Sequence, residues 1–461
     1  MKGETVRMNH LSGETLTDRV RHTRDKLRKM TLAAVFDEFD DKLMGLDRKK
    51  RAVKYRKMAE TPFSFFRGSA YLFYFDVTRA WFPYHTSPER PTWIQGDLHM
   101  ENFGAFRSGS GKLVYDVNDF DEGYLGSYLY DLLRMSVSIA LVARTKGLDK
   151  PAQASAIRAY LEAYGSQMRR FAKRKDDPRE FAIDEETAAG PVRKLLRKLR
   201  KRQDNHLLEK VTAMMQHQRQ FAETDELVSP TAEEQETLLA AWPQYTETAE
   251  TREAHGVHFQ IKDIAVKHGS GTASLGLDRF YVLIEATAAE AGAIDTDDAV
   301  LEVKEVRTPI PAYFMPYEEE FWTLFGGHQG RRVVLTQRAM HHEADRYLGT
   351  LSIGDRQFYV RERSPYKKRL KLDALETTDE LHAVLEAMGR LTAKLHARAD
   401  ADVQEGLLGY HSEDEIVRAM GEDEAAFCAT VGNWALSYAD QTERDHALFA
   451  QWSAARRKPK P

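Results

Sequence analysis

The sequence predicts an α+β protein with a mainly helical large lobe and a smaller lobe built on an antiparallel sheet. The chain has 461 residues, which exceeds what one hydrophobic core usually supports, so more than one subdomain is expected. Strand-like segments joined by short turns concentrate between residues 259 and 364, and the flanking parts of the chain are largely helical in pattern. Hydrophobic residues at 42% and charged residues at 30% are typical of a globular protein.

Composition excludes several classes of function. Lys plus Arg number 67 against 71 Asp plus Glu, so the overall charge of -4 does not favour binding a nucleic acid. The single cysteine, Cys428, excludes an internal disulfide and a cysteine-rich zinc site. The first residues are polar, and no apolar run approaches the length of a signal peptide core or a membrane span. We therefore expect a soluble, cytoplasmic protein without a membrane partner; the oligomeric state is left open.

The pattern divides the chain into four segments. Residues 1–60 form a basic helical segment, and residues 61–258 form the first part of the large lobe with a helical insertion from Pro151 to His258. Residues 259–364 form the small lobe, and residues 365–461 supply helices that complete the large lobe. The acidic, Thr-rich stretch 223–253 marks the main boundary or a surface excursion.

In the first half, short strands are predicted at 92–94 and 112–117, and a buried helix at 128–145 carries two polar exceptions, Asp131 and Arg134. The aromatic-rich stretch 61–75 requires a core, and Arg67 within it favours a structural stacking or pairing role over a phosphate contact. A long, basic amphipathic helix is predicted from Pro191 to Phe221, with its charges on a solvated face.

In the second half, residues 259–305 read as three strands, with a glycine loop after the first and an acidic turn after the second. A helix follows at 331–346, then strands at 347–353 and 357–362. A further helix is predicted at 380–398.

The segment GDLHMEN at 96–102 places a carboxylate and a carboxamide five positions apart on a tight loop. This spacing matches a kinase catalytic loop, in which Asp97 would accept or orient the proton of an attacking hydroxyl and Asn102 would bind magnesium. After the next strand come Asp116, Asp119 and Asp121, whose mutual repulsion a metal ion would relieve. We predict Asp119 as the principal metal ligand and Asp121 as the second; a turn of solvated acids is the simpler alternative.

Between the first two strands of the small lobe, VKHGSGTASLG offers a glycine turn that could approach phosphate closely. Taken by itself, the segment slightly favours a hairpin turn without a ligand. The sequence LEVKE, however, places Lys304 inside an apolar strand, where kinases keep their phosphate-binding lysine. The predicted nucleotide-binding residues are Gly269, Ser270, Gly271, Thr272, Gly276 and Lys304. The acid that pairs with Lys304 is open between Glu343 and the earlier Glu318, Glu319 and Glu320.

The blocks PFSFFRG, GDLHMENFG and NDFDE resemble those of a bacterial family called domain of unknown function 2252. The resemblance continues through GSGTASLG, LEVKE, RRVVLTQRAM, FYVRE and MGRLTAKLHAR and covers most of the chain. That family implies no activity.

The same pieces resemble aminoglycoside and choline kinase-like phosphotransferases, in which a helix like MGRLTAKLH precedes the GDLHMEN-type loop. Here that helix comes last, so the resemblance implies a circularly permuted, two-lobed protein-kinase-like fold. It further implies ATP or another nucleoside triphosphate with Mg²⁺, a hydroxyl-bearing acceptor that is a small molecule or a protein, and an Asp131 that braces the catalytic loop. Gln95 departs from the histidine common in those kinases.

Two other functions remain open at this point. A nucleotide-binding scaffold would keep the fold and use the acids structurally. A two-metal phosphoesterase would explain Gly96-Asp97-x-His99 and its neighbouring acids but would leave Lys304 and the glycine loop without a role.

Overall fold

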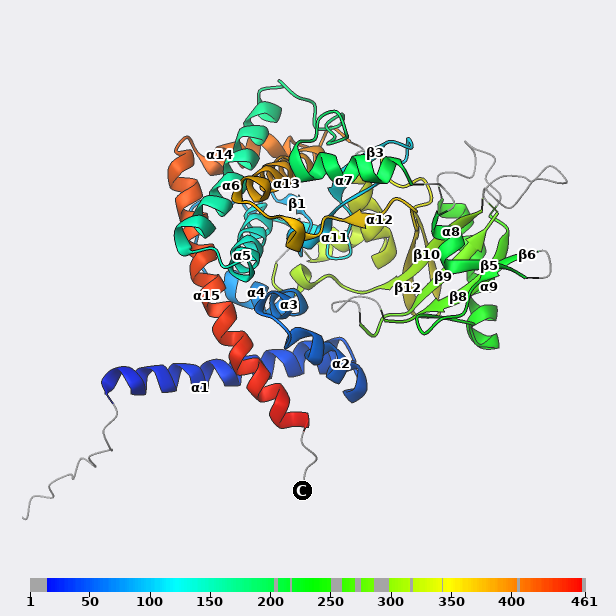
Figure 1. Ribbon diagram of the computed structural model, residues 1–461, viewed down its shortest axis with the longest axis horizontal. Coiled ribbons are helices and arrows are strands. Elements are labelled where there is room, and N and C mark those ends of the chain that lie inside the picture. Colours follow the sequence, from blue (N-terminus) through cyan, green and yellow to red (C-terminus); the bar gives the residue numbers. More distant parts are fainter. Residues whose placement is uncertain are drawn as a thin grey trace, which may run out of the picture.

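The computed structural model describes residues 15–202, 206–215, 218–249, 259–269, 275–285, 298–315, 318–341, 343–403 and 407–457. Most helices gather on one side of the molecule, and a six-stranded antiparallel sheet lies on the other (Figure 1). The α+β class predicted from the sequence is confirmed. Among the described residues, no helix combines the length and apolar character needed to cross a membrane.

Four helices open the described chain: α1 (Leu16–Phe36), α2 (Arg48–Met58), α3 (Pro62–Gly68) and α4 (Ala70–Val77), with a π-helical stretch at Asp37–Leu43. The side chains of Thr15, Asp47 and Thr61 accept hydrogen bonds from the first turns of α1, α2 and α3, which is why these helices begin there. The aromatic stretch 61–75 is buried, as expected, and forms α3 and α4.

Two small sheets carry the predicted motifs. Strand β1 (Thr92–Ile94) pairs with β4 (Tyr124–Gly126), and β2 (Phe103–Arg107) lies between β3 (Leu113–Val117) and β13 (Lys368–Arg369). A short 3₁₀ turn (Met100–Asn102) leads into β2. GDLHMEN therefore follows β1 and NDFDE follows β3, so both motifs lie at strand ends.

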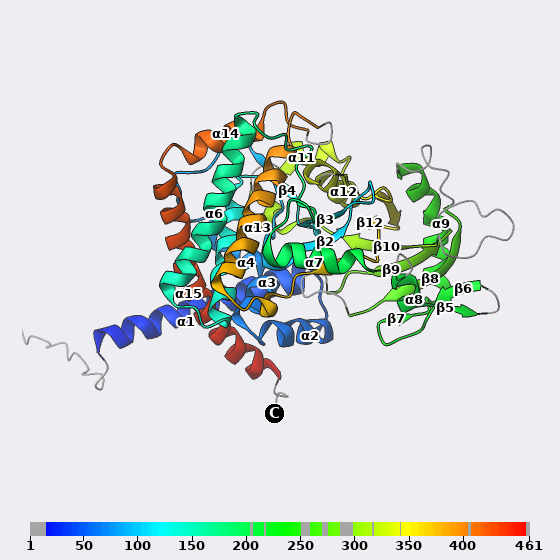
Figure 2. The same cartoon turned by 45° about the horizontal axis from the view of Figure 1, so that its top comes forward.

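The helical side is formed by α5 (Leu129–Thr145), α6 (Lys150–Ala172), α7 (Gly190–Arg200), α13 (Thr378–Arg398), α14 (Ser412–Met420) and α15 (Glu424–Arg457). Helix α13 lies along α6 although more than 200 residues separate them (Figure 2). Helix α15 packs on α5, α6 and α1. The C-terminal helices thus share a core with the first half of the chain.

The large sheet has the order β11 (Gly349–Ile353), β12 (Arg356–Glu362), β10 (Ala299–Val306), β9 (Arg279–Ile284), β8 (Ile261–Lys267) and β7 (Leu227–Val228). Helix α9 (Ala232–Thr248) covers one face through Trp242 and Tyr245. On the other face, Leu208 and Phe221 pack against Tyr281. Helices α11 (Glu318–Leu324) and α12 (Gln329–Met340) come between β10 and β11, and 3₁₀ turns lie at Ile310–Tyr313 and Leu372–Ala374.

The prediction of one long helix from Pro191 to Phe221 is wrong. Helix α7 ends at Arg200, and the chain then forms α8 (His206–Val211) and a hairpin of β5 (Thr212–Met215) and β6 (Gln218–Phe221). The half-buried Asp263 on β8 explains the change, because its carboxylate accepts a hydrogen bond from the backbone N–H of Phe221 at 2.7 Å. Tertiary contacts with the sheet override the helical propensity of this segment.

Candidate active site

The loop that carries Asp97 is held by a carboxylate from helix α5. Asp131 accepts hydrogen bonds from the backbone N–H groups of Gln95 at 2.6 Å and Gly96 at 3.0 Å. Gly96 has a φ of +87°, and a Cβ there would collide with the backbone carbonyl of Glu122, so only glycine fits this close approach. Asp131 thus makes the bracing contact that the kinase resemblance implies.

Helix α13 supports the same carboxylate from the far end of the sequence. Nε2 of His396 lies 3.2 Å from Oδ2 of Asp131, and its Nδ1 lies 3.0 Å from the hydroxyl of Tyr164 on α6. All three side chains are fully buried. A chain of buried polar contacts therefore joins α6, α13 and α5 to the loop at residues 95–96.

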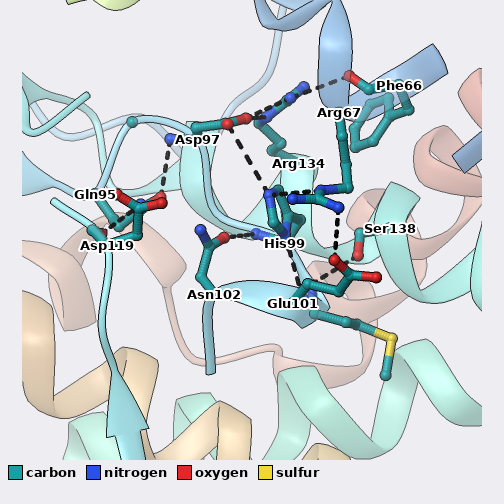
Figure 3. Close-up of polar contacts among 12 residues, drawn as sticks. Phe66, Arg67, Gln95, Asp97, His99, Glu101, Asn102, Asp119, Arg134 and Ser138 are labelled. Atoms are coloured by element: carbon teal, nitrogen blue, oxygen red, sulfur yellow. Dashed lines mark hydrogen bonds and ion pairs between the residues drawn. The ribbon is translucent and has the colours of Figure 1, made fainter. Parts of the chain in front are cut away.

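Asp97 is nearly buried and is bound by an arginine that also comes from α5. Nε of Arg134 donates to Oδ1 of Asp97 at 2.6 Å, and the guanidinium lies over the ring of Phe66 at 4.3 Å (Figure 3). Burial raises the pKa of Asp97 even though Arg134 opposes the shift. Oδ2, 4.0 Å from Nε2 of His99, is the oxygen not bound by Arg134.

The rest of the loop is held by its own side chains. Oδ1 of Asn102 accepts the backbone N–H of His99 at 2.7 Å, and Nε of Arg67 lies 3.2 Å from Nε2 of His99. Arg67 also pairs with Glu101 at 2.5 Å. Burial, reinforced by Arg67, lowers the pKa of His99 well below its usual value, so the imidazole is neutral at pH 7.

Asp119 and Asp121 follow β3 and differ in their surroundings. Oδ1 of Asp119 is buried and, within the described part of the chain, accepts no hydrogen bond. Asp121 pairs with Lys304 and accepts a hydrogen bond from the hydroxyl of Tyr359 at 3.0 Å. Although burial opposes it, Lys304 and Arg361 hold the pKa of Asp121 below its usual value. An unsatisfied carboxylate oxygen beside Asp97 and Asn102 is the kind of hard oxygen donor that Mg²⁺ requires.

Lys304 projects from β10 beside a group of buried arginines. Two residues earlier on the strand, the fully buried Glu302 receives Arg361 at 2.7 Å and Arg279 at 3.3 Å. Burial opposes ionisation of Glu302, but these arginines and Arg363 hold its pKa well below the usual value. The carboxylate of Glu302 thus holds the arginine side chains that make this side of the site positively charged.

Residues from both halves of the chain line one cleft of about 380 Å³. Its described lining includes nine basic and four acidic side chains, which favours a multiply charged anion together with a cation. The acidic residues are Asp97, Asp119, Asp121 and Glu122, and the basic residues are Arg67, Arg279, Lys304, Arg307, Arg361, Arg363, Lys367, Lys368 and Arg369. Asn102, which the sequence predicts as a metal ligand, also lines this cleft.

The glycine loop is described only at its ends. Gly269 and Gly276 have positive φ values of +78° and +95°, and Leu277 lines the cleft. Ser270, Gly271 and Thr272 lie outside the described residues. The sequence prediction for these three positions therefore stays a prediction.

Residues 47–452 match the family described as "Uncharacterized protein conserved in bacteria (DUF2252)". The chain belongs to the DUF2252 family. The matched range contains PFSFFRG, GDLHMENFG and NDFDE, the blocks from which the membership was predicted. No curated protein and no solved structure matches this DUF2252 chain.

Sequence reasoning left open which acid pairs with Lys304 in this DUF2252 protein, and the structure pairs it with Asp121. Helix α12 ends at Met340, short of the predicted 346, and Glu343 accepts a hydrogen bond from Ser108 at 2.9 Å instead. Glu319 is exposed on α11. The Lys304 partner that the structure describes thus comes from the motif after β3.

Sequence reasoning predicted Lys304 alone among the basic residues that line the described cleft, and it also missed two arginines that hold the loops of the site. Arg134 was noticed only as a polar exception on α5, and its spacing of three from Asp131 places both on one helix face toward the loop. Arg332 on α12 donates to the carbonyl oxygens of Gly123 and Asp121, each at 2.7 Å. A fully buried guanidinium needs hydrogen-bond acceptors, but no sequence pattern identifies backbone carbonyl groups as the acceptors of Arg332.

Proposed function

We propose that this protein is an ATP- and Mg²⁺-dependent phosphotransferase of the kinase-like type that acts on a hydroxyl-bearing acceptor. The observation that carries the proposal is the meeting of Asp97, Asn102 and Asp119 with the Lys304–Asp121 pair in one cationic cleft. These residues come from separate halves of the chain, and their chemical types are those that phosphoryl transfer needs.

The arrangement of elements supports a permuted kinase-like fold. Lys304 lies on the third strand of the unit β8–β9–β10, a helical segment follows, and β11 and β12 complete the sheet. Protein kinases also carry their lysine on the third strand, ahead of a helix. Helix α13, which would precede the catalytic loop in kinase order, reaches that loop through His396 and Asp131. This contact is the one expected if the kinase order has been cut and rejoined.

Each side chain has a defined task in this proposal. Oδ2 of Asp97 orients the acceptor hydroxyl and takes up its proton, and burial makes the carboxylate a stronger base. Lys304 and the arginines fixed by Glu302 bind and orient the phosphates of the donor. Asp119 and Asn102, with Asp121, would hold Mg²⁺. The chemistry supplied by bound Mg²⁺ is neutralisation of charge on the phosphate oxygens.

A second cavity, also of about 380 Å³, adjoins the cleft and shares Asn118, Arg361, Arg363 and Lys367 with it. Its lining adds Phe106, Val300 and Tyr366, which are suited to packing against a base. We place the nucleoside part of the donor there, with its phosphates in the cationic cleft.

Calorimetry with a non-hydrolysable ATP analogue tests the donor site. Wild-type protein should bind the analogue with Mg²⁺, Lys304→Ala should weaken binding at least about tenfold, and the exposed Lys112→Ala should bind as wild type does. Absence of binding to every nucleoside triphosphate tested would contradict the proposal.

Transfer of labelled γ-phosphate to a metabolite library then tests catalysis. A labelled product that depends on Asp97 supports the phosphotransferase. Nucleotide binding without any product, unaffected by Asp97→Asn, would instead favour a nucleotide-binding scaffold. A two-metal phosphoesterase is disfavoured because His99 is the one histidine among the described residues that line the cleft, and Arg67 already contacts it.

A further inference from the structure

A cluster of carboxylates around one imidazole lies outside the candidate active site, where the chain passes from α13 to α14. Nδ1 of His411 lies 3.8 Å from Oδ2 of Asp400, 3.6 Å from Oδ1 of Asp402 and 3.9 Å from Oε1 of Glu413. All three distances are too long for hydrogen bonds. One nitrogen thus faces three carboxylate oxygens and bonds to none of them.

Hydrogen bonding within the described chain leaves this cluster partly unsatisfied. Nδ1 of His411 is a buried atom without a hydrogen-bond partner among the described residues, whereas the side chains of Glu413 and Asp400 share a hydrogen bond. The side chains of Asp400 and Glu413 are 0% and 1% exposed, and that of His411 is 38% exposed.

The charges are also unbalanced. Three carboxyl groups meet here, two of which, Asp400 and Glu413, share a hydrogen bond, and the cation beside them is Arg174, which pairs with Glu413. The N-terminus of α14 favours acids in its first turn and so explains Glu413 in part. It explains neither the buried Asp400 two residues beyond α13 nor the orientation of the imidazole.

The spacing fits a metal ion. In a tetrahedral site with metal–ligand bonds of about 2.1 Å, the ligand atoms lie about 3.4 Å apart. The ligand atoms of Asp400, Asp402 and His411 all lie within 4.8 Å of one another, and the measured separations from His411 are a few tenths of an ångström above the tetrahedral value. A small inward movement of these side chains would complete the cage.

We propose that Asp400, Asp402 and His411, with Glu413 as a fourth ligand, bind a divalent transition-metal ion such as Zn²⁺. The imidazole selects against Mg²⁺ and Ca²⁺, which prefer oxygen ligands alone. Asp400 already joins the two segments, because its carboxylate accepts the backbone N–H groups of Asp402 and Ser412, each at 2.8 Å. The bound ion cross-links the end of α13 to the start of α14.

The test uses the full-length protein, stripped with a chelator and then titrated with ZnCl₂ while bound metal is measured by mass spectrometry. We expect one equivalent of Zn²⁺ and a rise in melting temperature that EDTA reverses. Asp402→Asn and His411→Gln should weaken binding at least about tenfold. Asp414→Asn, which alters a neighbouring, partly exposed acid, is the matched control and should bind Zn²⁺ as wild type does.

Two further arms keep the result unambiguous. Asp402 is partly exposed, so Asp402→Asn should fold, and equal melting temperatures of this variant and wild type in EDTA would verify it. Asp119→Asn should retain the equivalent of Zn²⁺, which separates this site from the proposed phosphotransferase centre. Wild-type protein that binds no Zn²⁺, or ligand variants that bind it as tightly as wild type, would overturn the proposal and leave a proton shared among the carboxylates.

Discussion

At the scale of single residues, the candidate site depends on carboxylates that differ in how fully their oxygens are bound. Asp97 is paired with Arg134 through one oxygen, Asp121 is bound by Lys304 and Tyr359, and Asp119 keeps a buried oxygen without a hydrogen bond among the described residues. Because their environments differ, substitutions at these positions should remove different parts of the reaction.

Asp97→Asn should lower phosphoryl transfer at least about 100-fold, since the proton acceptor is lost, and should leave nucleotide affinity within about threefold of wild type. Steady-state transfer rates and calorimetric dissociation constants measure the two effects separately. The exposed Asp355→Asn is the matched control. Wild-type turnover in Asp97→Asn would refute the assignment of the proton acceptor.

Asp119→Asn should act on metal-dependent binding instead. We expect the gain in nucleotide affinity on adding Mg²⁺ to fall at least about tenfold, because a charged oxygen donor becomes a neutral amide. Titrations of nucleotide with and without Mg²⁺ measure this gain. An unchanged Mg²⁺ effect would exclude Asp119 as a ligand.

Glu362 should make stability depend on pH. Burial is the larger cause and the negative charge of the neighbouring Asp345 the smaller one that raise the pKa of Glu362 to about 7. Since the folded-state pKa lies above the unfolded value, the stabilisation is fully present below about pH 4.5 and is lost as pH rises through about 7. Urea unfolding at pH 5 and pH 8 should show a fall in wild-type stability that Glu362→Gln reduces. An equal fall in both proteins would contradict this account.

At the scale of elements, strand β10 and helix α12 connect the sheet to the motif after β3. Strand β10 supplies Lys304 to Asp121, and α12 holds the backbone of the same turn through Arg332. The turn that carries the proposed metal ligands is thus fixed by elements far from it in sequence. Its geometry depends on how α12 sits against the sheet.

Arg332→Met should therefore loosen that turn. The substitution leaves buried carbonyl oxygens of Gly123 and Asp121 without their donor, which costs about 1 to 3 kcal/mol for each unsatisfied group. We expect a lower melting temperature and weaker Mg²⁺-dependent nucleotide binding. The neighbouring Arg331→Met, which alters an exposed side chain, should change neither quantity. Equal behaviour of the two variants would show that the turn does not need Arg332.

The sequence predicted most elements because their periodicity matches their burial. Strand β10 and helices α5 and α13 form within a few residues of their expected bounds. The prediction for residues 191–221 failed because the backbone N–H of Phe221 donates a hydrogen bond to Asp263, 42 residues away in the sequence. A local pattern contains no information about that contact. The Lys304 partner was open for the same reason: Asp121 lies 183 residues away in sequence.

At the scale of the whole molecule, the candidate site is assembled from distant parts of the chain. The motifs near residues 97 and 119, the strand that carries Lys304 and helix α13 meet although they are far apart in the sequence. The sequence led to the prediction that Lys304 faces the motif at Asp119 across a cleft. It did not reveal the connecting contacts, because buried pairs such as Asp131 with His396 become recognisable only when the helices are placed side by side.

A double-mutant cycle tests this connection. His396→Ala and Asp131→Asn should each lower transfer activity and stability, and their combined effect on unfolding free energy should differ from the sum by about 0.5 to 3 kcal/mol. The control cycle pairs Asp131→Asn with His446→Ala, whose histidine contacts the carbonyl of Ala59 on another helix. That cycle should add within about 0.5 kcal/mol. Additivity in both cycles would mean that α13 does not support the loop through Asp131.

The contact between His396 and Asp131 also bears on how the protein is made. The two residues are 265 positions apart, so at about 5 to 20 residues per second a ribosome needs roughly 15 to 50 s to pass from one to the other. During that interval the face of α6 that α13 will cover lacks α13, and Tyr160 and Tyr164 lack their partners Thr392 and His396. The catalytic loop is synthesised early and receives its last support late, so the nascent protein must keep this apolar face from aggregating until α13 arrives.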